Sequence, residues 1–343
     1  MQIVPSTAIV LVLLAIMVAS GPRRAMFILF SFLPFGMMAA FNLPAVGGTS
    51  IIGVDLAVVT LTLLLLSYRN GLNHLLSAFA PGTPGFLLFL FLGYSIFATA
   101  FFPRVFAGLE VFSLGRSGNE DGIIVQPLRP GNGNLSQLMR MILSIMAYSA
   151  VVVLVRRLRD AEQVLACVKL VTIVHVGMGV IDILTNAANL TFLLEPIRTA
   201  NYSLTLGQKT AGLNRVIGGF PEASSYGYLS LGLFGFWLSF WVTDKTRART
   251  GAIFLALMTF AVLRGTSSAA YVATMMLCVV FATSRVFAIT GGVVRVRNAA
   301  ILVTTLAMLP LALAGLYAIY ELVPAFAGFI DRALLDKLAT ESG

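Results

Sequence analysis

Long apolar segments alternate with short polar or basic segments along the whole chain. A helix needs about 20 mostly apolar residues to cross the hydrocarbon core of a bilayer. By that criterion the pattern predicts ten membrane-spanning helices, at residues 3–20, 25–42, 51–68, 85–102, 136–155, 163–184, 223–243, 250–264, 267–284 and 299–321. Because only helices satisfy their backbone hydrogen bonds within one segment in lipid, we expect an all-α, polytopic helical bundle that forms one integral membrane domain over residues 1–343.

The composition agrees with a membrane protein and changes how the net charge is interpreted. Hydrophobic residues make up 58% of the chain and charged residues 11%, whereas a soluble domain has about 25% charged residues. Many of the cations behind the net charge of +9 lie in short loops, where they set topology, so we expect no nucleic-acid partner. Cys167 and Cys278 fall inside apolar spans, which favours packing over a disulfide, and no spacing indicates a metal site or a cofactor.

The distribution of cations predicts the orientation of the spans. One set of short connections carries twelve of them: Arg23, Arg24, Arg69, Arg156, Arg157, Arg159, Lys245, Arg247, Arg249, Arg285, Arg295 and Arg297. Lys and Arg are enriched in cytoplasmic loops, so this side should be cytoplasmic. The longer loops 103–135 and 185–222 then lie outside, where we expect the working face. No basic segment precedes residues 3–20, which favours a first spanning helix over a cleaved signal peptide.

One polar stretch, residues 214–226, is not explained by apolar packing. Its sequence is Asn-Arg-Val-Ile-Gly-Gly-Phe-Pro-Glu-Ala-Ser-Ser-Tyr, and it joins a long loop to a predicted span. Charges at a membrane boundary are costly unless they are paired or functional. The guanidinium of Arg215 can bind phosphate in a bidentate manner, and the carboxylate of Glu222 can accept a proton from a sugar hydroxyl. The alternative is a salt bridge between them, with Pro221 and Glu222 in the first turn of a helix.

Two further stretches bring arginines to the same predicted boundary. Residues 127–140 open the fifth span, with Asn134 as a candidate helix cap and Arg140 about one turn inside. Arg140 either extends towards the lipid headgroups or faces a polar cavity. Residues 263–271 form a break between two spans, in which Arg264 precedes serines that can also serve helix packing. Together with Arg215, these arginines can form a cationic pocket for a diphosphate.

Three other charged residues lie in or near predicted spans. Asp55 and Asp182 are close to outer ends, and Lys169 is in the inner half of a span. For each we expect pairing with a neighbouring helix, and the alternative is a proton or ion pathway.

Three different motifs lie at the starts of predicted spans or between two of them: Asn134-Leu-Ser-Gln137, Arg215-Val-Ile-Gly-Gly-Phe-Pro-Glu222-Ala-Ser-Ser-Tyr226 and Arg264-Gly-Thr-Ser-Ser268-Ala-Ala-Tyr271. Their arrangement resembles the O-antigen ligase and O-antigen/exopolysaccharide polymerase superfamily of bacterial inner membranes. The Asn-x-x-Gln and Gly-Phe-x-Glu-x-Ser forms are most similar to exopolysaccharide polymerases. The resemblance covers roughly residues 120–343.

The resemblance implies a metal-independent glycosyl transfer, without a cofactor, at the periplasmic face. The donor would be a glycan on undecaprenyl diphosphate, and the acceptor a hydroxyl of a second glycan or a lipid. Glu222 and Arg215 would be catalytic, and the substrate-binding residues would be Arg140, Arg264, Asn134, Gln137, Tyr226 and Ser267. Membrane lipids and other polysaccharide assembly and export proteins would be further partners.

The chain departs from the family pattern in two places. Ligases commonly carry an arginine directly after the serine of the later motif, whereas Ser268 is followed by Ala269 and Arg264 comes before the serines. In the family, a tail similar to residues 336–343 begins a further external loop, which can supply a histidine in the ligases. The alternatives for this chain are a fragment, a gene product truncated at its C-terminus, or a reduced member of the family. Two other functions fit the same residues: a transporter or flippase for a lipid-linked glycan, and a non-catalytic scaffold of a polysaccharide export complex.

Overall fold

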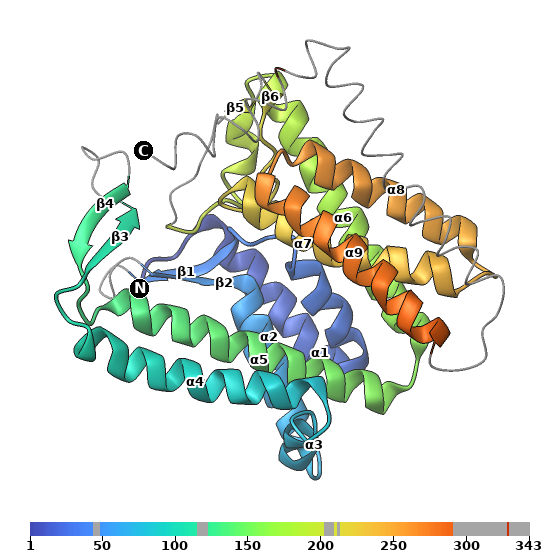
Figure 1. The fold of residues 1–343 in the computed structure, drawn as a ribbon, viewed down its shortest axis with the longest axis horizontal. Coiled ribbons are helices and arrows are strands. Elements are labelled where there is room, and N and C mark those ends of the chain that lie inside the picture. Colours follow the sequence, from blue (N-terminus) through green and yellow to red (C-terminus); the bar gives the residue numbers. More distant parts are fainter. Residues whose placement is uncertain (44–48, 115–122, 202–208, 211–212, 291–327, 329–343) are drawn as a thin grey trace. The chain divides into compact units, whose positions relative to one another are not determined.

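The structure is a computed structural model, which describes residues 1–43, 49–114, 123–201, 209–210, 213–290 and 328. Within that part of the chain, the helices are α1 (Pro5–Phe32), α2 (Gly53–Leu66), α3 (Gly71–Ser77), α4 (Pro84–Val105), α5 (Asn132–Leu158), α6 (Ala161–Ala187), α7 (Ala223–Thr243), α8 (Ala248–Arg264) and α9 (Ser268–Thr290) (Figure 1). The strands pair as antiparallel hairpins: β1 (Ala39–Leu43) with β2 (Thr49–Ile52), β3 (Glu110–Leu114) with β4 (Ile123–Pro127), and β5 (Lys209–Thr210) with β6 (Leu213–Asn214). A 3-10 helix, η2 (Thr191–Leu194), follows α6.

The helical content predicted from the sequence is confirmed, whereas ten spans are not. The helices expected at 85–102, 136–155, 163–184, 223–243, 250–264 and 267–284 correspond to α4 through α9. In the described part of the chain, five helices are long and apolar enough to cross a membrane, namely α1, α4, α5, α6 and α9, and the bent pair α2–α3 would add a sixth. Helix α8 has 17 residues, at the short end for a span. The span expected at 299–321 lies outside the described residues.

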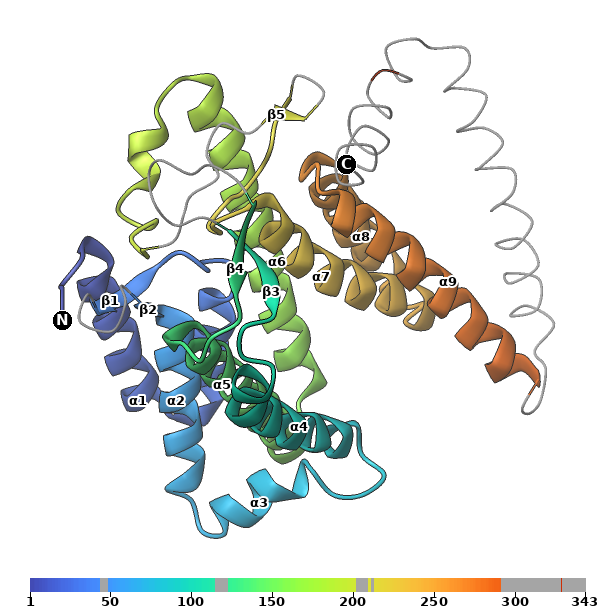
Figure 2. The same cartoon turned by 60° about the vertical axis from the view of Figure 1, so that its left-hand side comes forward.

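The contacts divide the chain into two compact units, Met1–Leu170 with Thr199–Tyr202, and Val171–Arg198 with Ser203–Gly343. The core of the first unit is formed by α1, α2, α5 and the start of α6. Val10, Met26 and Phe32 pack there with Leu61 and Leu154. Helix α4 packs along α5 in the same unit, and Figure 2 shows β3 and β4 side by side at the ends of these two helices.

Helix α1 reverses its direction at Gly21. Its backbone is not helical there, with φ 74° and ψ 174°, and Pro22 follows. The reversal brings Val10 and Phe32 together beside Gly53, where a Cβ atom built on this glycine would lie 3.1 and 2.9 Å from their side chains. A straight helix would hold them roughly 33 Å apart. The two predicted spans 3–20 and 25–42 therefore begin as an antiparallel helical hairpin.

The second of these spans ends early, which corrects the prediction for residues 25–42. The helix stops at Phe32, because Pro34 lacks an amide hydrogen and disfavours the helical conformation of the residue before it. Residues 39–43 instead form β1, whose Asn42 accepts a hydrogen bond from the amide of Gln2 at 2.8 Å. The hydroxyls of Ser6 and Thr7 bind the carbonyls of Ala39 and Ala40 at 2.5 and 2.6 Å.

The arginine-rich connections of the first unit gather at one end of it. Arg23 donates to Asp160 at 2.8 Å and to Gln163 at 3.1 Å, which joins the turn of α1 to the turn between α5 and α6. The guanidinium of Arg157 lies 4.5 Å from the ring centroid of Tyr68, at the end of α2. Three connections that the charge pattern assigned to one side of the membrane thus meet in space.

The second unit packs α7 against α8, α9 and the second half of α6. Trp237 is fully buried, stacks on Phe254 at 4.4 Å between centroids, and donates its indole N–H to Thr172 at 2.9 Å. Gly227 allows α7 to approach α9, because a Cβ atom there would lie 2.7 Å from that of Ala270. Close packing of α7 and α9 fixes where the loop before α7 meets the turn before α9.

Candidate functional site

The stretch from Asn214 to Glu222 forms an irregular loop between β6 and α7 in the second unit. Glu222 occupies the N-cap position of α7, and Pro221 therefore precedes the helix rather than opening its first turn. Gly218 has φ 54°, a left-handed conformation that favours glycine. Glycine is thus favoured at position 218, in the turn that separates Arg215 from Glu222.

A buried ion pair holds this turn. The Asp182 carboxylate accepts hydrogen bonds from the amides of Ile217 at 2.8 Å and Gly218 at 3.1 Å. Its other oxygen accepts from Arg198 at 2.5 Å, and the side chains of Asp182 and Arg198 are only 1% and 3% exposed. Arg198 also donates to the carbonyl of Gly218 through Nε at 3.0 Å and Nη2 at 2.5 Å. The turn is therefore bound through both its N–H groups and its carbonyl.

The pairing expected for Asp182 is present, but its partner is not on a neighbouring helix. Arg198 lies just beyond η2, in the loop that follows the helix carrying Asp182. Sequence reasoning missed Arg198. The usable signal was its closeness in sequence to an aspartate near the outer end of a span, because a buried carboxylate requires a nearby cation.

Two of the predicted arginines come together in the second unit. Arg264, at the end of α8, donates to the backbone carbonyl of Asn214 at 2.9 Å, next to Arg215. The hydroxyl of Tyr271 lies within electrostatic reach of both guanidinium groups and donates to the carbonyl of Leu263 at 2.6 Å. Arg215, Arg264 and Tyr271 therefore form one cluster, which we call the double-arginine cluster, with both arginines partly exposed.

Glu222 is exposed, and its carboxylate is oriented by α7. The hydroxyls of Ser224 and Ser225, in the first turn of the helix, donate to its Oε1 atom. An exposed carboxylate held by two hydroxyls is accessible to a substrate.

Tyr226 and Ser267, both expected to bind substrate, are 2% exposed. The ring of Tyr226 stacks on His175 at 4.1 Å and lies against glycines from three segments, Gly179 of α6, Gly218 of the loop and Gly265 of the turn between α8 and α9. Ser267 accepts a hydrogen bond from the amide of Ala270 at 3.4 Å, at the start of α9. The structure gives both residues contacts that support the fold around the loop.

His175 also lies in this region, although the sequence did not indicate it as a site residue. Its Nε2 atom lies 2.7 Å from the Ser230 hydroxyl, which in turn donates to the carbonyl of Tyr226 at 2.9 Å. This buried chain links α6 to α7 beneath the loop.

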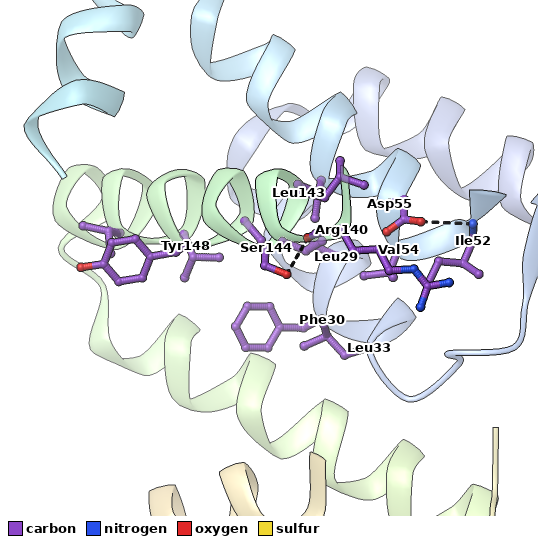
Figure 3. Close-up of a pocket in the computed structure, with 14 residues that line it drawn as sticks. Leu29, Phe30, Leu33, Ile52, Val54, Asp55, Arg140, Leu143, Ser144 and Tyr148 are labelled. Carbon is purple, nitrogen blue, oxygen red and sulfur yellow. Dashed lines mark hydrogen bonds between the residues drawn. The ribbon is translucent and has the colours of Figure 1, made fainter. Parts of the chain in front are cut away.

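The remaining predicted residues, Arg140, Asn134 and Gln137, belong to α5 in the first unit. Helix α5 begins at Asn132 after an N-cap at Gly131, so Asn134 is not the cap that the sequence suggested. Arg140 lines a cavity with Asp55, and Figure 3 shows their side chains at the same end of it. That cavity is mainly apolar, rather than the polar one considered from the sequence.

Comparison with family models, with curated proteins and with solved structures finds no match to this chain.

Proposed function

We propose that the protein is a multi-pass protein of the bacterial inner membrane that transfers a glycan from undecaprenyl diphosphate to a hydroxyl of an acceptor glycan or lipid. It would act at the periplasmic face, in exopolysaccharide or O-antigen biosynthesis. The observation that carries the proposal is the double-arginine cluster, in which Arg215 lies on the same loop as an exposed, oriented carboxylate.

The chemistry of such a transfer matches the exposed carboxylate and the double-arginine cluster. Glu222 accepts the proton of the acceptor hydroxyl, and the hydroxyl oxygen forms a bond to the anomeric carbon of the donor. The bond from that carbon to the diphosphate oxygen breaks, and the diphosphate leaves with the electron pair. Arg215 and Arg264 stabilise the leaving group, because guanidinium groups bind phosphate oxygens in a bidentate manner and remain charged.

The ion pair of Asp182 and Arg198 supports the proposal through the geometry of the loop. It binds the backbone at positions 217 and 218, between the arginine and the carboxylate. A charged group acts in catalysis only if it is held close to its productive position. We assign Asp182 and Arg198 to positioning, because their side chains are buried.

The charge pattern supports the periplasmic orientation. In the second unit, Lys245, Arg247 and Arg249 lie around the turn between α7 and α8, whereas Glu222 lies at the opposite end of α7. The 21 residues of α7 separate those ends by roughly 32 Å, about the thickness of the hydrocarbon core. Basic connections face the cytoplasm, which leaves the loop outside.

The test is the sidedness of the intermediate that accumulates in a Glu222→Gln variant. Glutamine keeps the size of the side chain but cannot act as the base, which typically contributes about 10²–10⁴-fold to a rate. We expect polymer growth to stop while lipid-linked glycan accumulates in the periplasmic leaflet, as detected with a membrane-impermeant glycan label. Glu195→Gln, an exposed change in the same predicted loop, is the matched control and should leave polymer unchanged.

Two outcomes would contradict the proposal. Glycan that remains in the cytoplasmic leaflet would identify a flippase instead. Normal polymer from a well-expressed Glu222→Gln variant would remove Glu222 as the base.

A further inference from the structure

The cavity in the first unit has a volume of about 710 Å³ and three helical walls. Its lining comes from the second arm of α1, from the start of α2 and from one face of α5. The apolar lining includes Leu29, Phe30, Leu33, Val58, Ala147 and Val151. A volume of this size is typical of a small-molecule site.

Charge is confined to one end of this cavity. Figure 3 shows Arg140 and Asp55 close to Ile52, and Tyr148 at the far end along α5. Asp55 accepts a hydrogen bond from the amide of Ile52 at 3.4 Å and attracts Arg140 electrostatically. From Arg140 to Val151, α5 extends for roughly 16 Å, and only Ser144 and Tyr148 add polar groups to its lining there. The hydroxyl of Ser144 already donates to the carbonyl of Arg140 at 2.9 Å.

This distribution specifies an amphipathic ligand with a charged head and a long apolar chain. The apolar walls exclude a sugar or a peptide, whose polar groups would be buried without partners. The head would lie beside both an arginine and an aspartate. A purely anionic head would meet repulsion from Asp55, whereas a head with one phosphate and one ammonium complements both charges.

We propose that the cavity binds a phospholipid of the phosphatidylethanolamine type, with its phosphate on Arg140, its ammonium on Asp55 and one acyl chain along α5. The acyl chain lies between α1 and α5 and contacts Phe30, Ala147 and Val151. This assignment gives Arg140 a ligand other than the diphosphate expected from the sequence. It does not rest on the proposed glycan transfer, because all of the residues belong to the first unit.

Native mass spectrometry of the full chain, delipidated in detergent and titrated with dioleoyl phosphatidylethanolamine or dioleoyl phosphatidylglycerol, tests the proposal. We expect one phosphatidylethanolamine per chain and a weaker complex with phosphatidylglycerol. Arg140→Gln should weaken phosphatidylethanolamine binding by about tenfold or more, because a charged hydrogen bond to the phosphate is lost. Arg104→Gln, which removes an exposed arginine near the end of α4, should leave it unchanged.

Two further variants separate the head from the chain. Asp55→Asn should abolish the preference for phosphatidylethanolamine over phosphatidylglycerol. Ala147→Leu and Val151→Phe should each reduce binding of both lipids by filling the cavity. The second variant replaces the first in the test if Ala147→Leu folds poorly. Folding is checked by protection of Cys167, which is fully buried in this unit, against a maleimide. Equal binding of the two lipids by the wild type, or unchanged binding in folded Ala147→Leu and Val151→Phe, would overturn the proposal.

Discussion

Asp182 and Arg198 bind the same peptide turn from two sides, the carboxylate through the amide of Gly218 and the guanidinium through its carbonyl. The carboxylate and guanidinium also contact one another, at 2.5 Å. The two side chains and the turn therefore form one unit, in which loss of any member leaves buried polar groups without partners.

Removing one member of this ion pair should be strongly destabilising. We expect Arg198→Met to cost about 3–5 kcal/mol, because it leaves the Asp182 charge buried and uncompensated. The double variant Asp182→Leu/Arg198→Met should cost less than the sum of the single changes. Fluorescence of Trp237 and Trp241, both on α7 in the same unit, follows unfolding in detergent. The exposed Arg249→Met is the control, and equal melting of the Arg198 and Arg249 variants would contradict a structural role of the pair.

Two glycines on α6 should respond in opposite ways to the same substitution. A Cβ atom at Gly179 would collide with the hydroxyl of Tyr226, whereas one at Gly177 meets nothing within 4 Å. Gly179→Ala should lower stability by about 1–3 kcal/mol through overpacking. Gly177→Ala should raise it by up to about 1 kcal/mol, because alanine favours a helix. The difference in melting temperature between the variants is the measurement, and a stabilising Gly179→Ala would refute the packing of Tyr226.

Lysine should not replace arginine in the double-arginine cluster, because a lysine ammonium is a point charge and cannot donate two parallel hydrogen bonds to a phosphate. Arg215→Lys and Arg264→Lys should each reduce polymer formation by about 10–100-fold, the loss of a charged hydrogen bond to phosphate. Arg247→Lys, which lies in the connection between α7 and α8, should have no such effect. High-molecular-weight polysaccharide is measured at matched protein levels. Wild-type activity of Arg215→Lys would remove Arg215 from the diphosphate site.

The orientation can be tested with single cysteines in a Cys167→Ala/Cys278→Ala background. Pro130→Cys and Glu195→Cys should react with a membrane-impermeant maleimide in intact cells, because both side chains are exposed and lie in the predicted external loops. His74→Cys and Thr246→Cys, exposed beside the arginine-rich connections, should react only after the membrane is permeabilised. The reverse result for either pair would invert the topology and place Glu222 in the cytoplasm.

The sequence predicted most of the helices, and its error over residues 25–42 has a local cause. The start of α7 was predictable because Pro221 and Glu222 precede a long, mostly apolar segment without charged residues. The predicted span continued past Pro34 because the residues after it are also apolar. These residues form a hairpin strand instead. Apolar strands and short apolar helices have the same hydropathy, so only the proline could have separated them.

The charged residues of the candidate site could be predicted from the sequence, whereas the residues that hold its loop in place could not. Arg215, Arg264 and Glu222 stand out because charge is rare in this chain. Arg198 joins the same region through the tertiary fold, since its contacts with Asp182 and Gly218 come from α6 and from an irregular loop. Tyr226 belonged to a recognisable motif, yet its burial against three glycines depends on helix packing that no local pattern encodes.

The reversal of α1 at Gly21 has a consequence for the surrounding bilayer. The arm that follows it, residues 22–32, rises only roughly 16 Å, and the 14 residues of α2 rise roughly 21 Å. Neither length matches a hydrocarbon core of about 30 Å. The β1–β2 hairpin follows the second arm of α1 and forms, with that arm and α2, a corner of the first unit; its backbone is hydrogen-bonded to the first arm of α1. Such hydrophobic mismatch is relieved when the adjoining leaflet thins. This corner would therefore indent the membrane surface, so that water and soluble sugars approach the protein below the ordinary level of the headgroups.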